Sequence, residues 1–486
     1  MISKFVREQQ RYTQQELCLI MECTDTEVVG YIRKLKEYSV LKAVRASDLQ
    51  KELSDLQEED IEVADVEAGE NEYLYVFTFV GVIVVAGRVL KCYPKYLLHV
   101  EKPIEELKQI IKVLEKYNAK EQIVRMFNDA SESRTFNFLA VLLFLLQDYY
   151  ENGTYSNSEN IIERNGSGEI LWDKTINETF TLLSNSRPYY IELLTKHRVN
   201  DDYDYFKRLH ECILSRASKE MHTAGLLELF EIEAVDLSDE ELDDFGEKEY
   251  ILYRIENELN AQFNTRKQLV LKTIYSYIAQ KGNLYDVDCL SLFGTNSFNL
   301  VWEDVCADIM DNQLNKALGA IKLPMPLKPI YDRNAKLIDL IEKPLWTATG
   351  MHARDTLIPD LVTINNSVQG CDFIIFDAKY YNARLEVGIY PKGQPGIESI
   401  TKQYLYQLAY QKFIKEHMIS KVHNCFLMPT DGGAVVDKGE VSMDMFKELG
   451  LQNIKVRLLP ARVAYQHYLE GSKMDINKLV LDNTSI

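Results

Sequence analysis

The chain has 486 residues, of which 46% are hydrophobic, and it carries a net charge of −19. This composition excludes a disordered chain and predicts a packed globular protein of two to four domains, at roughly 150 residues per domain. No apolar run is long enough to span a membrane, and the first residues lack the apolar segment of a secretory signal, so we expect a cytoplasmic protein. The eight cysteines are scattered without a CxxC pair, which argues against disulfides and against a zinc site.

The charge is unevenly distributed along the chain. Residues 291–486 contain 21 Lys and Arg against 22 Asp and Glu, so the surplus of acid lies earlier. Much of it lies in "SDLQEEDIEVADVEAGENE" at residues 54–72, which is either a solvated loop or a docking surface for a basic partner. An acidic chain is poorly suited to bind DNA on its own, because phosphate contacts need Lys and Arg.

The first hundred residues combine helical and strand patterns. Residues 13–44 predict two helices around a turn, with Thr24 or Thr26 as the N-cap of the second helix. Residues 73–97 are rich in Val, Tyr and Phe and predict two or three strands. This order is typical of a winged helix, and a protein-docking module of the same shape is the alternative. A winged helix would turn the following basic residues toward DNA: Arg33, Lys34 and Lys36.

The middle of the chain is mostly helical in pattern. Residues 101–150 predict helices, the polar and Gly-rich residues 151–168 predict a loop or hairpin, and residues 201–282 predict long helices. We therefore expect an α/β multidomain protein in three parts: a winged-helix-like module at 1–100, a mainly helical middle domain at 101–288 and a C-terminal αβ domain at 289–486.

The C-terminal part predicts the order helix, strand, strand, helix, strand. These elements are expected at 298–314, 357–365, 371–381, 398–417 and 424–430, with a hairpin at "NNSVQG" between the two strands.

Two carboxylates and a lysine fall on the predicted hairpin. Asp377 and Lys379 lie two apart on the second strand and share one face, and strand pairing can bring Asp360 beside Asp377. Two adjacent carboxylates repel unless a cation intervenes. Mg²⁺ suits such oxygen ligands, Mn²⁺ is the alternative, and the Ala378 carbonyl can complete the set. Lys379 would orient or deprotonate the attacking water, or neutralise charge on the phosphate, in phosphodiester hydrolysis.

The tripeptide Asp377-Ala378-Lys379 is a short pattern, and its context decides its meaning. An acidic residue two before a lysine occurs at one other place, Glu106 to Lys108, inside an amphipathic helical run with no preceding Pro-Asp. The alternative interpretation is an Asp at a turn with a salt bridge at the end of a strand. The full order of elements around the tripeptide favours a hydrolytic site.

The sequence from 291 to 430 resembles the PD-(D/E)xK nucleases. The resemblance implies that Asp360 and Asp377 are metal ligands, that Lys379 is the catalytic lysine and that Glu303 is the metal-binding acid on the preceding helix.

The run "KQYLYQLAYQ" resembles the helix after the lysine in the subgroup where a Gln or Tyr supports the site. Gln403 and Gln407 are both candidates, and we prefer Gln407 for its neighbour Tyr410.

A narrower resemblance rests on "FTFVGVIVVAGRVLKCYPKYL" early in the chain and "DAKYY" late in it. Together they resemble the LlaJI restriction endonucleases and McrC-type nuclease subunits. This implies a cleavage subunit that acts on double-stranded DNA with a GTP-driven AAA+ motor partner. The chain has no GxxxxGK[ST] motif, so it is not that motor. The alternatives are a winged-helix regulator with a degenerate nuclease fold, against which the intact site residues argue, and a self-sufficient repair, tRNA-processing or restriction nuclease.

Overall fold

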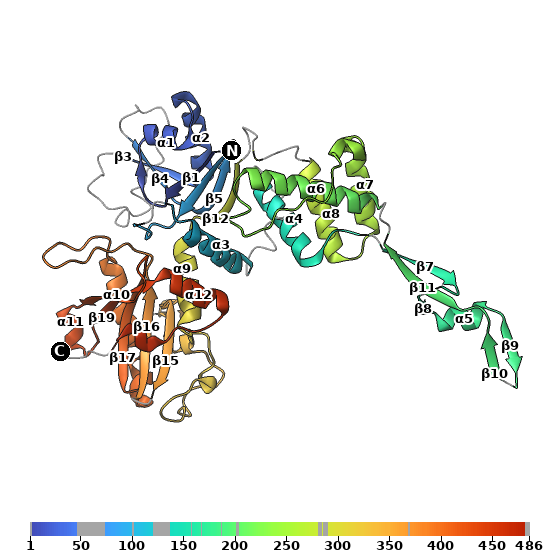
Figure 1. The fold of residues 1–486 in the computed structure, drawn as a ribbon. Helices are drawn as coiled ribbons and strands as arrows, with labels where there is room; N and C mark the ends of the chain where they lie inside the picture. The colour runs from blue at the N-terminus through green and yellow to red at the C-terminus, as the bar shows by residue number, and fades with distance from the viewer. Residues whose placement is uncertain are drawn as a thin grey trace. The chain divides into compact units, whose positions relative to one another are not determined.

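The computed structural model divides into two compact units. Unit 1 spans Thr135–Ser291, and unit 2 combines Ile2–Arg134 with Leu292–Ile486. The described part of the chain forms a mixed α/β protein with 12 α-helices and six sheets (Figure 1). The described residues are 2–45, 73–99, 102–119, 137–156, 158–166, 168–185, 187–200, 204–279, 284, 290–367 and 370–481. The acidic run at 54–72 therefore lies outside them, and no helix within them is long and apolar enough to cross a membrane.

The first part of unit 2 contains two helices and two small sheets. Both helices begin with a capping box, in which Thr13 and Thr24 accept hydrogen bonds from the backbone three residues later. Thr24 is thus confirmed as the N-cap of the second predicted helix. The elements are β1 (Ile2–Arg7), β2 (Arg11–Tyr12), α1 (Gln14–Met21), α2 (Asp25–Glu37), β3 (Leu41–Arg45), β4 (Tyr73–Phe77), β5 (Val80–Val85) and β6 (Arg88–Tyr93).

The predicted strand trio at 73–97 is confirmed, but its strands belong to two different sheets. One sheet has the order β2-β4-β3, and the other has the order β1-β6-β5-β12, where β12 is Leu290–Thr295. Strand β12 lies so close to β5 that a Cβ on Gly81 would meet the Phe293 carbonyl oxygen at 2.1 Å. Gly81 also has a φ of 138°, which side chains rarely tolerate, so this contact requires glycine. Helix α3 (Ile104–Ala119) packs on α9 and α12 of the same unit.

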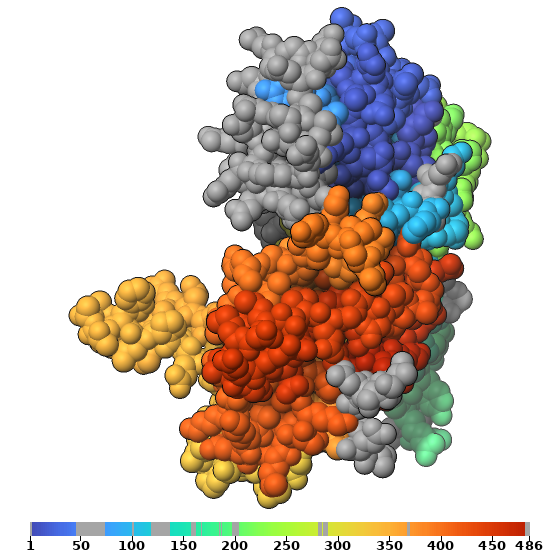
Figure 2. Space-filling model, turned by 90° about the vertical axis from the view of Figure 1, so that its left-hand side faces the viewer, coloured from blue at the N-terminus to red at the C-terminus, as the bar shows by residue number. Residues whose placement is uncertain are grey.

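A five-stranded mixed sheet forms the centre of the C-terminal part of unit 2. Its order is β15-β16-β17-β19-β18, with β16, β17 and β19 parallel and the two edge strands antiparallel to their neighbours. The elements are α9 (Phe298–Ile309), β13 (Leu345–Trp346), β14 (Met351–His352), β15 (Leu361–Ser367), β16 (Gly370–Ala378), α10 (Ile397–Glu416), β17 (Lys421–Thr430), β18 (Val436–Val441), α11 (Asp444–Glu448), β19 (Ile454–Pro460) and α12 (Ala461–Glu470). Figure 2 shows the amber segment around β13 and β14 standing out from this part.

All five elements predicted for 298–430 are present, although α9 ends at Ile309 instead of residue 314. Strand β16 is buried along nearly its whole length, as its continuous apolar run predicts for a central strand. Helix α10 packs on the face of β16 that carries Phe373 and Ile375, through Tyr406 and Tyr410 among others. Because side chains alternate along a strand, Asp377 continues this same face toward the end of β16.

Unit 1 consists of a helical body and a long arm (Figure 1). The body contains α4 (Phe138–Asn152), α6 (Tyr205–Thr223), α7 (Lys248–Ala261) and α8 (Thr265–Ala279), so the helices predicted for 201–282 are confirmed. The arm was not predicted beyond a loop or hairpin at 151–168. It contains β7 (Ser158–Arg164), β8 (Glu169–Ile170), α5 (Trp172–Glu178), β9 (Thr181–Ser184), β10 (Arg187–Tyr190) and β11 (Leu194–Asn200).

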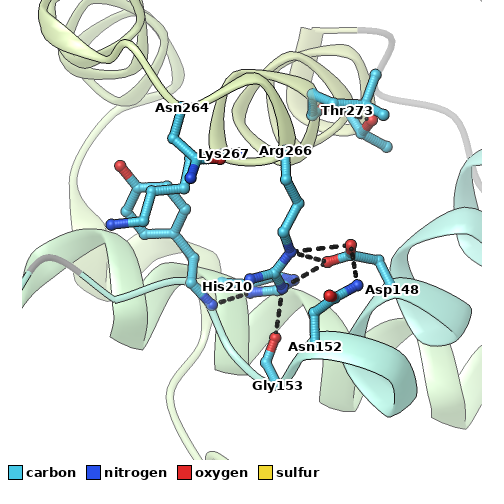
Figure 3. Close-up of polar contacts among 10 residues, drawn as sticks. Asp148, Asn152, Gly153, His210, Asn264, Arg266, Lys267 and Thr273 are labelled. Carbon is cyan, nitrogen blue, oxygen red and sulfur yellow. Dashed lines mark hydrogen bonds and ion pairs between the residues drawn. The ribbon is translucent and has the colours of Figure 1, made fainter.

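A buried ion pair fastens α8 to α4 in the body of unit 1 (Figure 3). Arg266 Nε and Nη2 donate to both carboxylate oxygens of Asp148 at 2.7–3.2 Å, and Nη2 also donates to the Gly153 carbonyl at 2.7 Å. Beside it, His210 Nδ1 accepts the Tyr155 N–H at 2.9 Å, and burial lowers the pKa of His210 to about 4. The bidentate geometry lets one arginine satisfy an otherwise costly buried carboxylate.

Candidate active site

The hairpin of β15 and β16 brings two aspartates together at the end of β16. The register pairs Leu361 with Phe376, so the residue before β15, Asp360, falls opposite Asp377. Asp360 Oδ2 accepts the Ala378 backbone N–H at 2.9 Å, and the two carboxyl groups are close enough to hydrogen-bond each other. The antiparallel pairing of β15 and β16 begins at this point, so the backbone places the side chains of Asp360 and Asp377 next to each other.

Asp377 is a carboxylate in an unfavourable environment. It is only 3% exposed, and burial raises its pKa, with the adjacent Asp360 adding to the rise. Lys379 Nζ lies 2.9 Å from Asp377 Oδ1 as an ion pair, yet no donor makes a hydrogen bond of good geometry to this buried oxygen. A buried acceptor without a donor is costly, so this atom is suited to a ligand that supplies positive charge.

Lys379 is half-buried beside this pair. Burial alone would lower its pKa, but the charges of Asp377 and Asp360 outweigh that effect and raise the pKa above its ordinary value. The ammonium therefore remains protonated near neutral pH in this arrangement. Its backbone N–H donates to the Leu427 carbonyl of β17 at 2.9 Å, which ties the segment after β16 to the sheet.

Helix α9 carries Glu303 into the electrostatic reach of the aspartates. Burial raises the pKa of Glu303 to about 7, with a further contribution from Asp360 and an opposing one from Lys379. The helix is placed by Trp302, whose indole N–H donates to the Leu427 carbonyl at 3.2 Å. Across the described ranges no three His, Cys, Asp or Glu side chains converge closely enough to hold a metal ion, so Glu303 stands outside the contact of Asp360 and Asp377.

The two candidate glutamines of α10 contact different strands. Gln407 Oε1 accepts hydrogen bonds from Asn424 Nδ2 at 2.6 Å and from the Gln452 N–H at 3.0 Å, which fills its acceptor with structural contacts. Gln403 Nε2 donates to the Ile375 carbonyl at 2.8 Å, and its buried Oε1 makes no hydrogen bond. Neither glutamine contacts the aspartates through these bonds, and the choice between them stays a prediction.

Tyr406 of α10, which the sequence did not single out, interacts electrostatically with both aspartates of the site. Burial raises its pKa to about 12, and the charges of Asp377 and Asp360 both contribute. Its hydroxyl donates to the Ile358 carbonyl at 3.0 Å, just before Asp360. The only signal in the sequence was its place in the Tyr- and Gln-rich run that contains both glutamines.

The donors present fit a hard divalent cation. Mg²⁺ commonly takes one or two protein carboxylates and keeps several waters, so a pair of aspartates is a sufficient set. The buried Oδ1 of Asp377, which accepts no hydrogen bond of good geometry, and the repulsion between the two carboxyl groups are the features that a divalent cation would relieve. Asp360 meets Ala378 through the backbone N–H, and a ligand role for the Ala378 carbonyl stays a prediction.

Comparison with known proteins places this chain among restriction enzymes. Residues 79–459 match the family described as LlaJI restriction endonuclease. The chain therefore belongs to this family and is a restriction endonuclease, which confirms the resemblance seen in the sequence.

The chain is also similar to individual proteins. It is 25% identical over 414 residues to the type II restriction enzyme BsuMI component YdjA of Bacillus subtilis (strain 168), covering 83% of each chain. A structure of Thermococcus gammatolerans McrB AAA+ hexamers with bound McrC aligns over 96% of this chain and 99% of that chain, with 11% identity and a TM-score of 0.38. A cryo-EM structure of the Thermococcus gammatolerans McrBC complex aligns over 57% of this chain and 79% of that chain, with 11% identity and a TM-score of 0.22.

Proposed function

We propose that this restriction endonuclease hydrolyses phosphodiester bonds of double-stranded DNA in a Mg²⁺-dependent reaction at Asp360, Asp377 and Lys379. The observation that carries the proposal is the buried pair of aspartates at the end of β16, with the Lys379 ammonium 2.9 Å from Asp377 Oδ1. Two carboxyl groups side by side repel when both are ionised, and one ammonium offsets only part of their charge. In an enzyme of this family it is the best candidate for the cleavage centre.

The residues of the site have separate tasks in this proposal. Asp360 and Asp377 would hold Mg²⁺, with Mn²⁺ as a substitute, and the Ala378 carbonyl would complete the set. Glu303, which does not converge with the two aspartates, would act on the metal site from outside this direct contact. The bound cation would neutralise charge on the phosphate and favour ionisation of water. Lys379, held protonated by its two acidic neighbours, would stabilise the negative charge that develops on the phosphate. Removal of the Asp377 carboxylate should leave Lys379 without its ion-pair partner.

The topology supports a PD-(D/E)xK core as the framework of the site. Helix α9 precedes an antiparallel hairpin, and α10 then connects β16 to its parallel neighbour β17. We further propose that α1, α2, β3 and β4 form a winged-helix-like module, since two capped helices lead into an antiparallel strand pair. The DNA-binding regulator with a degenerate nuclease fold is disfavoured because the two aspartates and Lys379 are assembled together.

We propose that the chain is the cleavage subunit of a multi-subunit system with a GTP-driven AAA+ motor. The related Bacillus subtilis protein is named a component, and this chain has no nucleotide-binding motif of its own. The acidic run at 54–72 is one candidate contact. The arm of unit 1 is a second one, because it exposes several large apolar side chains: Trp172, Ile176, Phe180, Leu183, Tyr189 and Ile191. A self-sufficient nuclease remains the alternative.

The cleavage centre is tested by Asp377→Ala in the full chain with its partner subunits. We expect loss of Mg²⁺-dependent plasmid cleavage. The variant should still be folded by circular dichroism, and it should still bind its partner. The matched control is Asp372→Ala, which removes a half-buried aspartate from the same strand, away from the site, and should leave cleavage unchanged. Undiminished cutting by folded Asp377→Ala would refute the assignment.

A further inference from the structure

The residue after Lys379 is held by the first hundred residues of the chain. Tyr380 is only 7% exposed, and its hydroxyl donates to Glu8 Oε2 at 2.5 Å. Glu8 follows directly after β1 and is itself 6% exposed. This bond joins residues 372 positions apart in the chain.

A second contact to Tyr380 comes from the segment after β6. Lys95 Nζ lies 4.6 Å from the centroid of the Tyr380 ring and also donates to Gln9 Oε1 at 3.0 Å. The Lys95 backbone N–H donates to the same Glu8 oxygen at 3.2 Å. Glu8 and Lys95 thus enclose the hydroxyl and the face of one tyrosine in a single buried network.

Tyr380 also contacts the start of the helix that bears Glu303. The ring centroids of Phe298 and Tyr380 are 5.3 Å apart, and Phe298 is the first residue of α9. The Tyr96 ring packs edge-on at 6.2 Å, and the Tyr96 hydroxyl is 3.0 Å from that of Tyr465 on α12. The Tyr380 side chain therefore connects the N-terminal strands and α9 to the end of β16.

We propose that Glu8, Lys95 and Tyr380 form a positioning network that holds the backbone of Lys379, so that the N-terminal part of unit 2 belongs to the cleavage machinery. This inference rests on the proposed function. Strand β16 ends at Ala378, so Lys379 lies beyond the ladder and depends on other contacts for its place. Its own backbone bond to Leu427 is one, and the anchored Tyr380 next to it is the other. A misplacement of about 1 Å at a reacting group can slow catalysis about 100-fold.

The network explains a feature of the sequence that the hydrolytic site alone does not. The early segment "YPKYL" contains Lys95, and the late segment "DAKYY" contains Tyr380. The structure brings the two segments into contact within one unit. Burial raises the pKa of Glu8, and the nearby Lys95 opposes this rise, as expected for a charge held inside a packed network.

The test uses Tyr380→Phe, Glu8→Gln and the double variant, each nearly isosteric, in the full chain with its partner subunits. The readouts are the single-turnover rate of plasmid cleavage at saturating protein, the Kd for the same DNA, and hydrogen exchange of the Lys379 amide in the chain alone. We expect each single variant to cleave about 10-fold more slowly, with an unchanged Kd and faster exchange at Lys379. Because both variants act on the same bond, which Glu8→Gln weakens and Tyr380→Phe removes, the double variant should be about 10-fold slower as well, not 100-fold.

Tyr12→Phe is the matched control. Tyr12 is buried, its hydroxyl accepts the Arg7 N–H at 2.9 Å, and it does not contact Tyr380, so this variant should change neither rate nor exchange. The inference is overturned by wild-type rates in both single variants, by multiplicative effects in the double variant, by a loss confined to DNA affinity, or by equal slowing in Tyr12→Phe. Lys379→Ala run in parallel separates the two claims: wild-type cleavage by that variant defeats the proposed function, while the exchange readout still reports on the network.

Discussion

Replacing Asp377 by asparagine should stabilise the metal-free protein while it removes activity. In the wild type, Asp377 is buried beside Asp360 on one side and Lys379 on the other. At an effective dielectric constant of about 20, charges roughly 3–4 Å apart interact by about 4–6 kcal/mol, so the repulsion and the attraction largely cancel. What remains is the cost of burying the carboxylate, several kcal/mol, against about 1–3 kcal/mol for an amide. We expect Asp377→Asn to gain about 2 kcal/mol, or roughly 3 °C in Tm for a unit of this size.

The raised pKa of Asp377 determines how the stability difference between the wild type and Asp377→Asn changes with pH. A carboxyl whose pKa is raised on folding stabilises the folded state while it is protonated. That contribution is complete below the ordinary carboxyl pKa of about 4 and is lost as the pH rises through the raised pKa of Asp377. The advantage of Asp377→Asn in EDTA should therefore grow as the pH rises from about 4 to about 8.

Thermal unfolding in EDTA and in Mg²⁺ checks both halves. Saturating Mg²⁺ should raise the Tm of the wild type and leave that of Asp377→Asn nearly unchanged, because only the wild type retains both carboxylates. A variant that is less stable than the wild type in EDTA at pH 8, or one that Mg²⁺ stabilises equally, would show that the aspartate pair is an ordinary structural contact.

Three further predictions concern the lysine, unit 1 and the partner. Lys379→Ala should keep Mg²⁺ binding, measured by calorimetry, but slow cleavage about 100-fold or more. Lys379→Arg should restore the cleavage rate only in part, because a guanidinium does not replace a compact ammonium. Cleavage at the wild-type rate by Lys379→Ala would contradict a role for this lysine. Arg266→Met should destabilise unit 1 by about 3–5 kcal/mol in thermal unfolding, because it leaves Asp148 buried without a cation. The control Arg164→Met breaks an exposed pair with Glu192 and should cost at most about 1 kcal/mol. Equal effects of the two variants would refute the distinction between buried and exposed pairs. The isolated chain should bind DNA with a Kd no tighter than about 10⁻⁶ M at physiological salt and should need its partner and nucleotide to cleave. Deletion of 54–72 and the substitution Leu183→Asp, each assayed for partner binding, distinguish the acidic run from the arm as the contact. Rapid sequence-specific cutting by the chain alone would establish a self-sufficient enzyme.

The hairpin and its neighbours were predictable because their signals are local. Continuous apolar runs bounded by turn residues mark β15, β16 and β17, and the spacing of Asp377 and Lys379 places them on one face. Strand β19 lacks such a signal, since Lys455 and Arg457 interrupt it. The structure buries both, and Arg457 is satisfied by Asp437 and by the Leu479 and Val480 carbonyls, contacts that no local pattern encodes.

The features that escaped prediction depend on long-range packing. The strands of the arm carry few alternating apolar residues, so β7 and β11 are defined by pairing with each other and not by their own pattern. The oxygen of Gln407, which we preferred for its neighbour Tyr410, is engaged by Asn424 and Gln452, contacts that the sequence does not indicate. The contact of Glu8 with Tyr380 joins the two ends of unit 2, and only the folded chain reveals it.

Diffraction from crystals grown with Mn²⁺ tests the central claim most directly, since the anomalous signal of this ion locates it without reference to activity. We predict a peak in contact with carboxylate oxygens of both Asp360 and Asp377, including the buried Oδ1 of Asp377, and its loss in Asp377→Ala crystals. Absence of a peak at Mn²⁺ concentrations that support DNA cleavage in solution, with the two carboxyl groups still side by side, would contradict the assignment of this aspartate pair as the metal-binding cleavage centre.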